Sequence, residues 1–559
     1  MTPKQKWFLI GIMTLAIIFR FYQIVAMPGG LFPDEAANGL DINSMQRGDL
    51  QPFYERGNGR EALFFYMLWG SVEVFGKGPW QHHIVSAGVG VLAVLGCFLA
   101  TRKLFQLLTK ETDGAIAAKR ATDLALLASF FMAVSAWHTV LSRTAFRANL
   151  IPLFTTFSIY FLILTVMAET RAKRYIWSII TGATFALGFY SYIAYRIFVP
   201  IVAFAILWPL AVDIWQSPRF QNIRKLFWPT IVAKLSFIIF ISQLAYYFYT
   251  HPGSFIGRSG QVSVFNPELN NGNLVGTILE VSWVSLRAYF WDGDLNWRHN
   301  ISGEPFLSII ISPFFAIGLV GVTYLAARYI FTPIKNKLDW KYFLIAGCFW
   351  GMLIPVITTA EGIPHGLRAI GTIPFVFIIS AIGLMWVMGY ASKVVNKFWP
   401  YLSETQHKIL NFAFNLKTIA FIIALVLQSF FLYFVYAANS PENFYAFRSD
   451  LTPVSEYLKE FGNKTNTYLV LDKFSIQTVD YFTTVDAKHP TNPENQPYTQ
   501  VDPEDSWKLD HLKANDKIVF TQSSIFDIKK FKEYHPEATL TQEMRNKFGQ
   551  SVMAVYTIK

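Results

Sequence analysis

The amino-acid sequence predicts a polytopic α-helical membrane protein of about eleven transmembrane helices, followed by a small extracytoplasmic α/β domain. Three observations support this fold class. The 559 residues are 53% hydrophobic and only 15% charged, whereas soluble domains usually carry about 25% charge. Apolar segments long enough to span a bilayer recur along the first three quarters of the chain. The composition then changes, from Ala438 onward, to short strand-like and helical stretches.

The predicted transmembrane segments each contain about 20 mainly apolar residues. Lys4 and Lys6 precede the first of them, but no A-x-A cleavage site follows it, so we expect a retained span and not a signal peptide. The segments are centred on Ala16, Leu92, Phe130, Tyr160, Ala183, Ala205, Ile239, Ile317, Cys348, Ile379 and Ala424.

Lysine and arginine residues between the apolar segments predict the orientation of the chain. With a cytoplasmic N-terminus, the most basic loops all fall on the cytoplasmic side, as the positive-inside rule requires. Residues 28–80, 142–149, 250–305 and 361–368 then lie outside the cytoplasm. The net charge of +11 does not indicate a nucleic-acid partner, because the basic residues form no continuous face. We therefore expect a multi-pass protein of the cell membrane.

The C-terminal residues predict a separate domain. The stretches "NTYLVLDKFS" and "KANDKIVFTQ" are typical of short strands, and "SEYLKEFG" and "IFDIKKFKEY" are typical of helices. An even mixture of this kind indicates an α/β domain. We therefore divide the chain into a transmembrane domain, 1–437, and an extracytoplasmic domain, 438–559.

Polar residues gather on the predicted outer side, beginning with Asp34 and Glu35 in "LFPDEAANGL". A helix start explains part of this pattern, because Pro33 suits a first helical position and acids complement the helix dipole. Arginines on an outer face, however, are not topology signals. Four further clusters lie on this side: "ERGNGRE" (55–61), "SRTAFRAN" (142–149), "WDGDLNWRHN" (291–300) and "HGLRA" (365–369).

Carboxylates and arginines at one membrane interface fit the transfer of a sugar from a polyprenyl phosphate to an acceptor hydroxyl or amine. Arginine pairs with a leaving phosphate through charge-assisted, often bidentate hydrogen bonds. The acceptor loses a proton as it attacks an oxocarbenium-like carbon, which requires a carboxylate base on the face opposite the departing phosphate. One acid and several cations are sufficient for this chemistry.

The chain resembles the polyprenyl-phosphate-dependent glycosyltransferases of the type C fold, in the branch of protein O-mannosyltransferases and lipid A aminoarabinose transferases. In that branch an Asp-Glu pair begins the first extracytoplasmic loop, where this chain has Asp34-Glu35 in "FPDEAANGL". The resemblance covers the membrane part and implies inverting chemistry with Asp34 as catalytic base. The family often has a basic residue and two prolines before an apolar helix. Here "GREALFFYMLWGSVEVFG" has Arg60 at the basic position but Glu61 and Ala62 in place of the prolines.

We therefore expect an active site at the outer membrane face, between the Asp34 loop and the arginine-bearing outer loops. Glu35 would orient Asp34 or the acceptor. Basic residues are the expected partners of the donor phosphate: Arg60, Arg368, His365 and Arg196. Aromatic and polar residues are the expected contacts of the sugar or acceptor: Tyr195, Asp294, Trp297, Arg298 and His299. Contacts with lipid headgroups and interfacial anchoring are the plainer alternatives for many of these side chains.

The expected partners are a polyprenyl-phosphate sugar donor, membrane lipids, and a protein, glycolipid or polysaccharide acceptor that the sequence does not identify. Oxygen and imidazole ligands for a divalent metal are present, but HExxH or a comparable spacing is not, so we expect metal-independent chemistry and no cofactor. A secondary transporter or lipid flippase is the main alternative function. Transporters usually place charged residues near the bilayer midplane, whereas the charges here gather at the outer ends.

Overall fold

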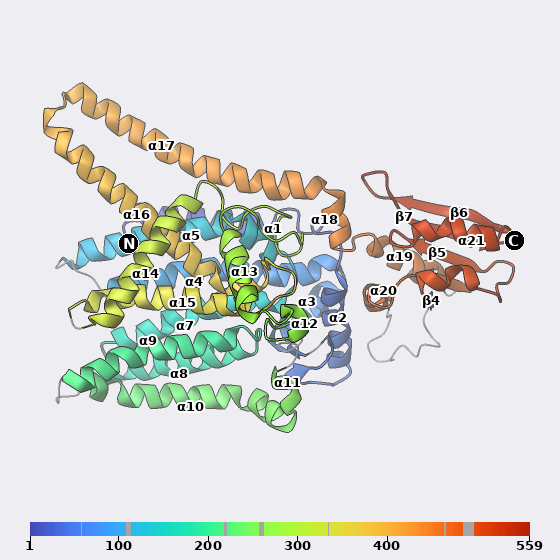
Figure 1. Cartoon of the computed structure of the whole chain (residues 1–559), viewed down its shortest axis with the longest axis horizontal. Coiled ribbons are helices and arrows are strands. Elements are labelled where there is room, and N and C mark those ends of the chain that lie inside the picture. Colours follow the sequence, from blue (N-terminus) through green and yellow to red (C-terminus); the bar gives the residue numbers. More distant parts are fainter. Residues whose placement is uncertain are drawn as a thin grey trace. The chain divides into compact units, whose positions relative to one another are not determined.

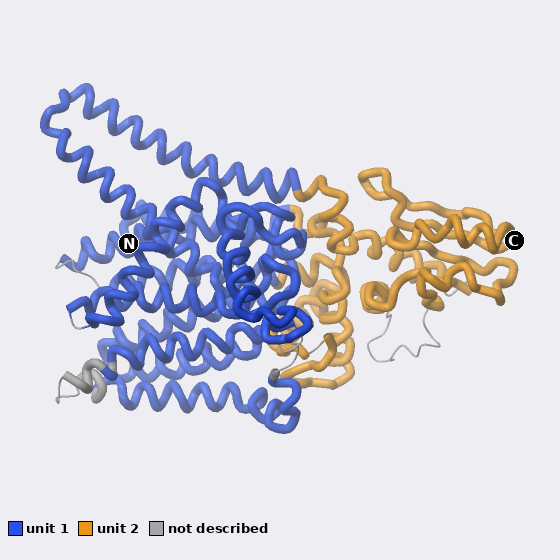
Figure 2. Tube along the Cα trace, viewed as in Figure 1, with its two compact units in different colours: residues 1–22, 86–436 blue, residues 23–85, 437–559 orange. Residues whose placement is uncertain are grey.

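The computed structural model describes the chain except for residues 58, 108–112, 217–220, 257–261, 334, 463–465 and 484–496, and except for the side chains of 210, 212–216 and 221–224 (Figure 1). The chain forms two compact units (Figure 2). Unit 1 comprises Met1–Tyr22 and Ser86–Tyr436. Unit 2 comprises Gln23–Val85 and Ala437–Lys559.

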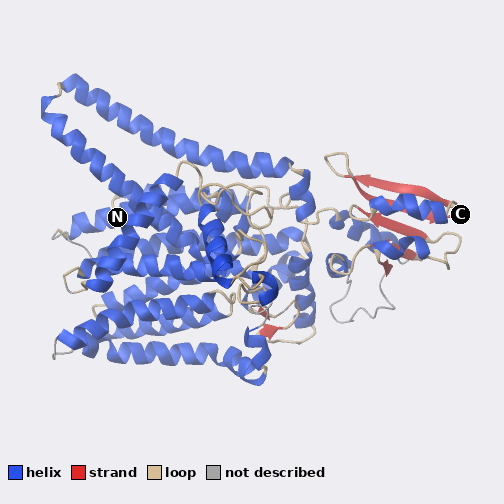
Figure 3. Cartoon of the chain, in the orientation of Figure 1, coloured by secondary structure: helices blue, strands red, loops and turns tan. Residues whose placement is uncertain are grey.

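Unit 1 is built from helices (Figure 3). Helices α8 and α10 pack side by side, as do α14 and α16 (Figure 1). The long helices are α1 (Pro3–Phe21), α4 (Pro79–Leu107, which begins in unit 2), α5 (Gly114–Val134), α7 (Leu150–Met167), α8 (Arg171–Phe189), α9 (Tyr195–Gln216), α10 (Gln221–Thr250), α13 (Leu274–Arg287), α14 (Ser312–Phe331), α15 (Trp340–Ile357), α16 (Ile373–Phe398) and α17 (Glu404–Phe430). Shorter helices include α6 (Ala136–Ser142), α11 (Pro252–Ile256) and α12 (Pro267–Asn270).

Each predicted span centre lies in a helix of this unit. Within the described part of the chain, 7 helices are long and apolar enough to cross a membrane, and α5 with α6 makes an eighth if the pair, bent by 64°, is one span. The predicted centres Ala16, Ala183 and Ala205 lie in α1, α8 and α9, which are outside that count. Basic residues occupy α1 and the start of α8, and the apolar part of α9 is short, Tyr195–Pro209.

The break between α5 and α6 is held by a fully buried arginine of α1. Carbonyl groups at the end of a helix lack intrahelical donors, which is costly where water is excluded. Arg20 supplies donors, because its guanidinium hydrogen-bonds the carbonyl oxygens of Ala133 at 2.6 Å and Met132 at 3.1 Å. Arg143, also buried, donates to the carbonyl of Arg20 at 2.8 Å. Both arginines therefore have a structural role.

Unit 2 combines the first predicted outer loop with the C-terminal residues. The loop forms α2 (Pro33–Gln46), the antiparallel pair β1 (Phe53–Tyr54) and β2 (Arg60–Glu61), and α3 (Leu63–Phe75). The C-terminal part has a five-stranded sheet in the order β4-β3-β5-β7-β6, with β3 parallel to β4 and β5, which confirms the predicted α/β domain. Its elements are α18 (Pro441–Ala446), α19 (Leu451–Phe461), β3 (Thr467–Val470), α20 (Ile476–Thr483), β4 (Thr499–Val501), β5 (Lys517–Thr521), α21 (Ile528–Tyr534), β6 (Ala538–Arg545) and β7 (Ser551–Ile558).

Helix α2 packs directly on α20 of the C-terminal domain. The hydroxyl of Thr478 donates to the carbonyl of Leu31 at 3.1 Å. Gly39 lies against the ring of Tyr481 so closely that a Cβ at this position would come within 2.4 Å of the ring. The structure therefore groups residues 23–85 with the C-terminal domain, which differs from the expected division at 437/438. The difference arises from contacts of α2 and the residues before it with α20, such as the hydrogen bond between Leu31 and Thr478, which are 447 residues apart. No local sequence pattern reveals such contacts.

We expect Arg20→Leu to destabilise the protein, because it removes the buried hydrogen bonds to the carbonyls of Met132 and Ala133 and leaves Ala133 without this donor. Each buried acceptor left unsatisfied costs about 1–3 kcal/mol. The purified protein in detergent should therefore unfold several degrees below wild type in a thermal scan. Arg171→Leu, at an exposed position, is the control and should leave Tm unchanged. Equal Tm values for Arg20→Leu and wild type would contradict this role of Arg20.

Candidate functional site

The acidic pair divides into two different environments at the start of α2. Pro33 is the first residue of the helix, and Asp34 and Glu35 lie in its first turn. The carboxylate of Glu35 is fully buried and accepts the backbone N–H of Phe32 at 3.0 Å, as a capping residue does. Its other oxygen lies 3.4 Å from Nε2 of the buried His83. Protein contacts thus occupy Glu35 on both sides.

Asp34, in contrast, is exposed. Its carboxylate makes no hydrogen bond or ion pair with any residue that the structure describes. The first turn of a helix is a favourable place for an acidic side chain, and no described residue occupies the oxygens of this one. A free, correctly held carboxylate is what a base requires. The helix-start explanation therefore accounts for Glu35 and Pro33, but it leaves the oxygens of Asp34 available.

Arg60 is held by contacts within unit 2. Its guanidinium pairs with Asp41 of α2 at 2.6 Å and donates to the side-chain oxygen of Asn38 at 2.7 Å. Its Nε donates to the carbonyl of Arg56 at 2.9 Å. The side chain is buried, so Arg60 ties the β1–β2 pair to α2. These contacts account for Arg60 without a ligand.

Arg56 shares the same acid but has a different environment. Its Nε pairs with the second oxygen of Asp41 at 2.8 Å, and 43% of its side chain is exposed. Within the described residues, only Nε of its guanidinium has a partner. Arg56 belongs to the cluster "ERGNGRE", but Arg60 is the residue at the family's basic position and is therefore the one that the sequence favours. Both arginines pair with Asp41, and the difference in exposure of their side chains shows that Arg56 is the accessible one.

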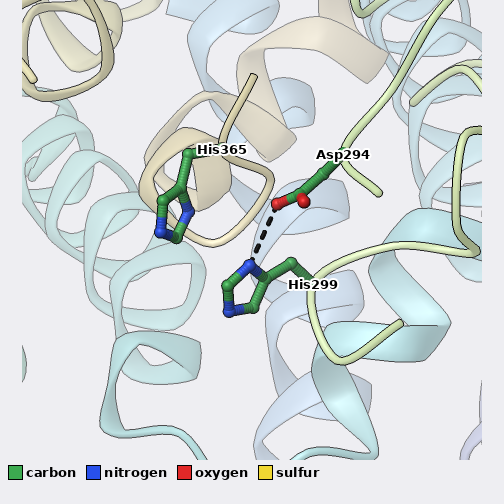
Figure 4. Close-up of side chains that lie close together, drawn as sticks. All are labelled: Asp294, His299 and His365. Carbon is green, nitrogen blue, oxygen red and sulfur yellow. Dashed lines mark hydrogen bonds and ion pairs between the residues drawn. The ribbon is translucent and has the colours of Figure 1, made fainter. Parts of the chain in front are cut away.

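In unit 1 the structure brings together residues from two predicted outer loops. Asp294 accepts hydrogen bonds from Nδ1 of His299 at 2.9 Å and from the backbone N–H of Gly366 at 2.8 Å (Figure 4). The imidazole rings of His299 and His365 stack with centroids 4.5 Å apart. Arg368 donates its backbone N–H to Nδ1 of His365 at 3.4 Å. The loops around 294–299 and 365–368 therefore form one polar cluster, the Asp294 cluster.

The protonation state of the Asp294 cluster follows from its burial. Burial lowers the pKa of the His299 imidazole below its ordinary value, although the carboxylate of Asp294 acts in the opposite direction. The neutral ring donates from Nδ1 to Asp294, so its Nε2 carries a lone pair. That lone pair can accept a proton, accept a hydrogen bond from a hydroxyl group or coordinate a metal ion.

A divalent metal fits the Asp294 cluster by ligand type. Asp294, His299 and His365 each offer one ligand atom, and these atoms all lie within 4.8 Å of one another. Two imidazoles and a carboxylate are a common donor set for Zn²⁺. The carboxylate is also satisfied by protein donors alone, since the N–H of Asn296 reaches its second oxygen at 2.8 Å. Metal-independent chemistry stays our prediction.

Two other predicted site residues, Tyr195 and Arg196, have contacts with other parts of unit 1. Tyr195 is fully buried, and its hydroxyl shares a hydrogen bond with Ser158 at 3.0 Å. This burial accounts for Tyr195 as a packing residue of unit 1, and a contact with a sugar stays a prediction. Arg196 lies over the rings of Phe248 and Phe255, with centroid distances of 4.9 and 4.6 Å.

Trp297 and Arg298 lie between Asp294 and His299 in the same loop. The ring of Trp297 lies 5.9 Å from that of Tyr436. The backbone carbonyl of Arg298 accepts a hydrogen bond from Thr144 at 3.3 Å. Arg368 pairs with Glu361 at 3.5 Å and keeps 14% of its side chain exposed. These contacts fix the loop but do not test a role in sugar or phosphate binding.

No protein-family model matches the sequence, and no curated protein matches it significantly. Solved structures do resemble the fold. ArnT from Cupriavidus metallidurans in the apo state has a TM-score of 0.50 at 11% identity, covering 99% of this chain and 98% of ArnT. The Archaeoglobus fulgidus oligosaccharyltransferase AglB has a TM-score of 0.50 at 12% identity, covering 99% of this chain and 74% of AglB.

The A. fulgidus oligosaccharyltransferase in its apo form has a TM-score of 0.43 at 12% identity, and the match covers 86% of this chain and 64% of the oligosaccharyltransferase. Identities this low show the fold alone. The fold agrees with the resemblance that the Asp-Glu pair and the arrangement of spans indicate. The chain is therefore a multi-pass membrane protein with the type C glycosyltransferase fold.

Proposed function

We propose that this chain is an integral membrane glycosyltransferase that transfers a sugar from a polyprenyl phosphate to an acceptor at the outer membrane face. The observation that carries the proposal is the contrast within the acidic pair. Glu35 is buried and occupied, whereas the adjacent Asp34 is exposed and has no partner among the described residues. The AglB structure with the same fold contains a dolichol phosphate, which supports a polyprenyl-phosphate donor.

In the proposed reaction Asp34 accepts the proton of an acceptor hydroxyl or amine. The acceptor atom forms a bond to the anomeric carbon of the donor sugar, while the bond between that carbon and the phosphate oxygen breaks. The electron pair leaves with the phosphate. Because attack and departure occur on opposite faces, the configuration at the anomeric carbon inverts.

Cations assist the departure of the phosphate. Arg368 and His365 stay our candidates from unit 1. In unit 2 we assign this role to Arg56 instead of Arg60, because the three nitrogen atoms of the Arg60 guanidinium are already bonded to Asp41, Asn38 and the carbonyl of Arg56. The accessible end of Arg56 can make bidentate contacts with a phosphate.

Asp34→Asn should lower transfer by at least about 100-fold, the usual effect of losing a general base. The assay uses purified protein in nanodiscs, a panel of polyprenyl-phosphate sugars with candidate acceptors, and mass spectrometry of the released polyprenyl phosphate. Tm should stay at the wild-type value because Asp34 has no described partner to lose. Glu35→Gln is the matched comparison and should lower Tm. Transfer by Asp34→Asn at the wild-type rate would remove Asp34 from the chemistry.

Arg56→Gln and Arg60→Gln should separate a functional arginine from a structural one. We expect Arg56→Gln to slow transfer about tenfold or more, since a charged hydrogen bond to phosphate is worth about 1.5–3 kcal/mol. It should lower Tm less than Arg60→Gln does, because Asp41 keeps its buried pair with Arg60. Arg60→Gln should lower Tm more strongly, because it removes the buried ion pair with Asp41 and the hydrogen bond to Asn38. If Arg56→Gln is fully active, Arg56 does not hold the phosphate.

Treatment with EDTA should leave the transfer rate unchanged, since the carboxylate of Asp294 is satisfied by three protein N–H groups. Metal content by elemental analysis is measured on the same samples. Loss of activity with EDTA, recovered with Zn²⁺ or Mn²⁺ in wild type but not in Asp294→Asn, would contradict metal-independent transfer.

A further inference from the structure

Unit 1 contains a large apolar cavity, distinct from the Asp294 cluster. Its volume is about 650 Å³. Side chains of α7, α8, α9, α10, α14 and α15 line it, and most are aliphatic or aromatic. Two lysines, Lys234 and Lys337, are part of the lining. A cavity of this size and character suits an apolar ligand or the apolar part of an amphipathic one.

The cavity lies at the opposite end of the bundle from the Asp294 cluster. Trp340 lines it and is the first residue of α15. The other end of α15 is Ile357, which leads into the loop that carries His365 and Arg368. A helix of 18 residues is about 27 Å long, so the two features lie about that far apart along the helix axis. The positive-inside prediction assigns the cavity to the cytoplasmic half of the membrane.

Lys234 is the unusual residue in this cavity. The candidate span that contains it runs from Lys225 to Thr250, and Lys234 lies nine residues, or about 13 Å, along it. A charged side chain within a span is costly and normally has a partner or a function. Within the described part of the chain, the ammonium groups of Lys234 and Lys337 make no hydrogen bond or ion pair. Two cations without a described partner therefore border an apolar space.

We propose that this cavity binds an anionic phospholipid of the surrounding membrane. An acyl chain fills the apolar space, and the ammonium groups of Lys234 and Lys337 hold the phosphate. Charge complementarity supports this occupant, because the walls offer no anion to pair with the lysines in the described structure. A negatively charged inner leaflet supplies such lipids at high local concentration, and juxtamembrane basic residues attract them.

The bound lipid has a structural consequence for α10. This helix packs mainly on α8 and is otherwise largely exposed within the unit. The lining includes Tyr329 of α14, Trp340 of α15 and Pro333 between these helices, as well as residues of α10. A lipid chain between them joins the two sides through apolar contacts. Because it binds the folded protein only, the lipid also raises stability, and the gain increases with the logarithm of the free lipid concentration once the site is mostly filled.

The test measures lipid binding to the delipidated full-length protein in detergent. Phosphatidylglycerol, phosphatidylcholine and undecaprenyl phosphate are added separately, and bound lipid is counted by native mass spectrometry alongside Tm. We expect one tightly bound phosphatidylglycerol that raises Tm, and weaker binding of phosphatidylcholine. Lys234→Gln should weaken phosphatidylglycerol binding about tenfold or more. Lys225→Gln, on the same helix but outside the lining, is the matched control and should bind as wild type does.

Ala203→Trp provides an independent variant, because it fills the cavity without changing a charge. It should remove the tightly bound phosphatidylglycerol and its effect on Tm. Unchanged phosphatidylglycerol binding in both Lys234→Gln and Ala203→Trp would overturn the proposal. Selective loss of undecaprenyl phosphate in these variants, with phosphatidylglycerol unaffected, would overturn the proposed occupant. Neither result depends on transferase activity, so this inference can fail while the proposed function holds.

Discussion

The buried carboxylate of Glu35 is the interaction on which the proposed chemistry of Asp34 depends. It closes the first turn of α2 by accepting the N–H of Phe32, and it lies against His83 on its other side. Consecutive residues of a helix point in different directions. Glu35 is held in the interior, and the preceding residue, Asp34, is exposed. The C-terminal domain packs against the same helix, because the ring of Tyr481 contacts Gly39. Capping and tertiary packing together hold one free carboxylate in place.

Buried charges in unit 1 are balanced mainly by the backbone. Arg20 donates to carbonyls at the break between α5 and α6, and Asp294 accepts two backbone N–H groups as well as the imidazole of His299. Such partners are fixed by the fold and cost little side-chain entropy. A charge buried in this way stabilises one specific backbone path. Buried charged side chains thus satisfy backbone groups at helix breaks and loops, where an unpaired N–H or carbonyl would be costly in the absence of water.

Local pattern was sufficient for the helices and for the C-terminal α/β domain, because apolar runs and strand-like stretches record burial directly. The sequence also selected Asp294, His299, His365 and Arg368 as site candidates, but it assigned them to separate roles, and only the structure shows that their loops form one cluster. Local pattern was insufficient for Tyr195, whose burial depends on packing against α7, and for Arg60, whose partner Asp41 lies on another element. The grouping of α2 with α20 depends on contacts distant in sequence. The sequence did not indicate a role for Lys234, because the mean hydropathy of its span is high in spite of this charged residue.

The central claim is that Asp34 acts as the base. The most direct measurement is the pH dependence of single-turnover sugar transfer by wild type and by Asp34→Asn, with the donor identified from the panel. The account predicts that the wild-type rate rises with pH along one limb, as the base ionises, and that the residual rate of Asp34→Asn lacks this limb. The same limb in both proteins would show that another group accepts the proton and would contradict the account.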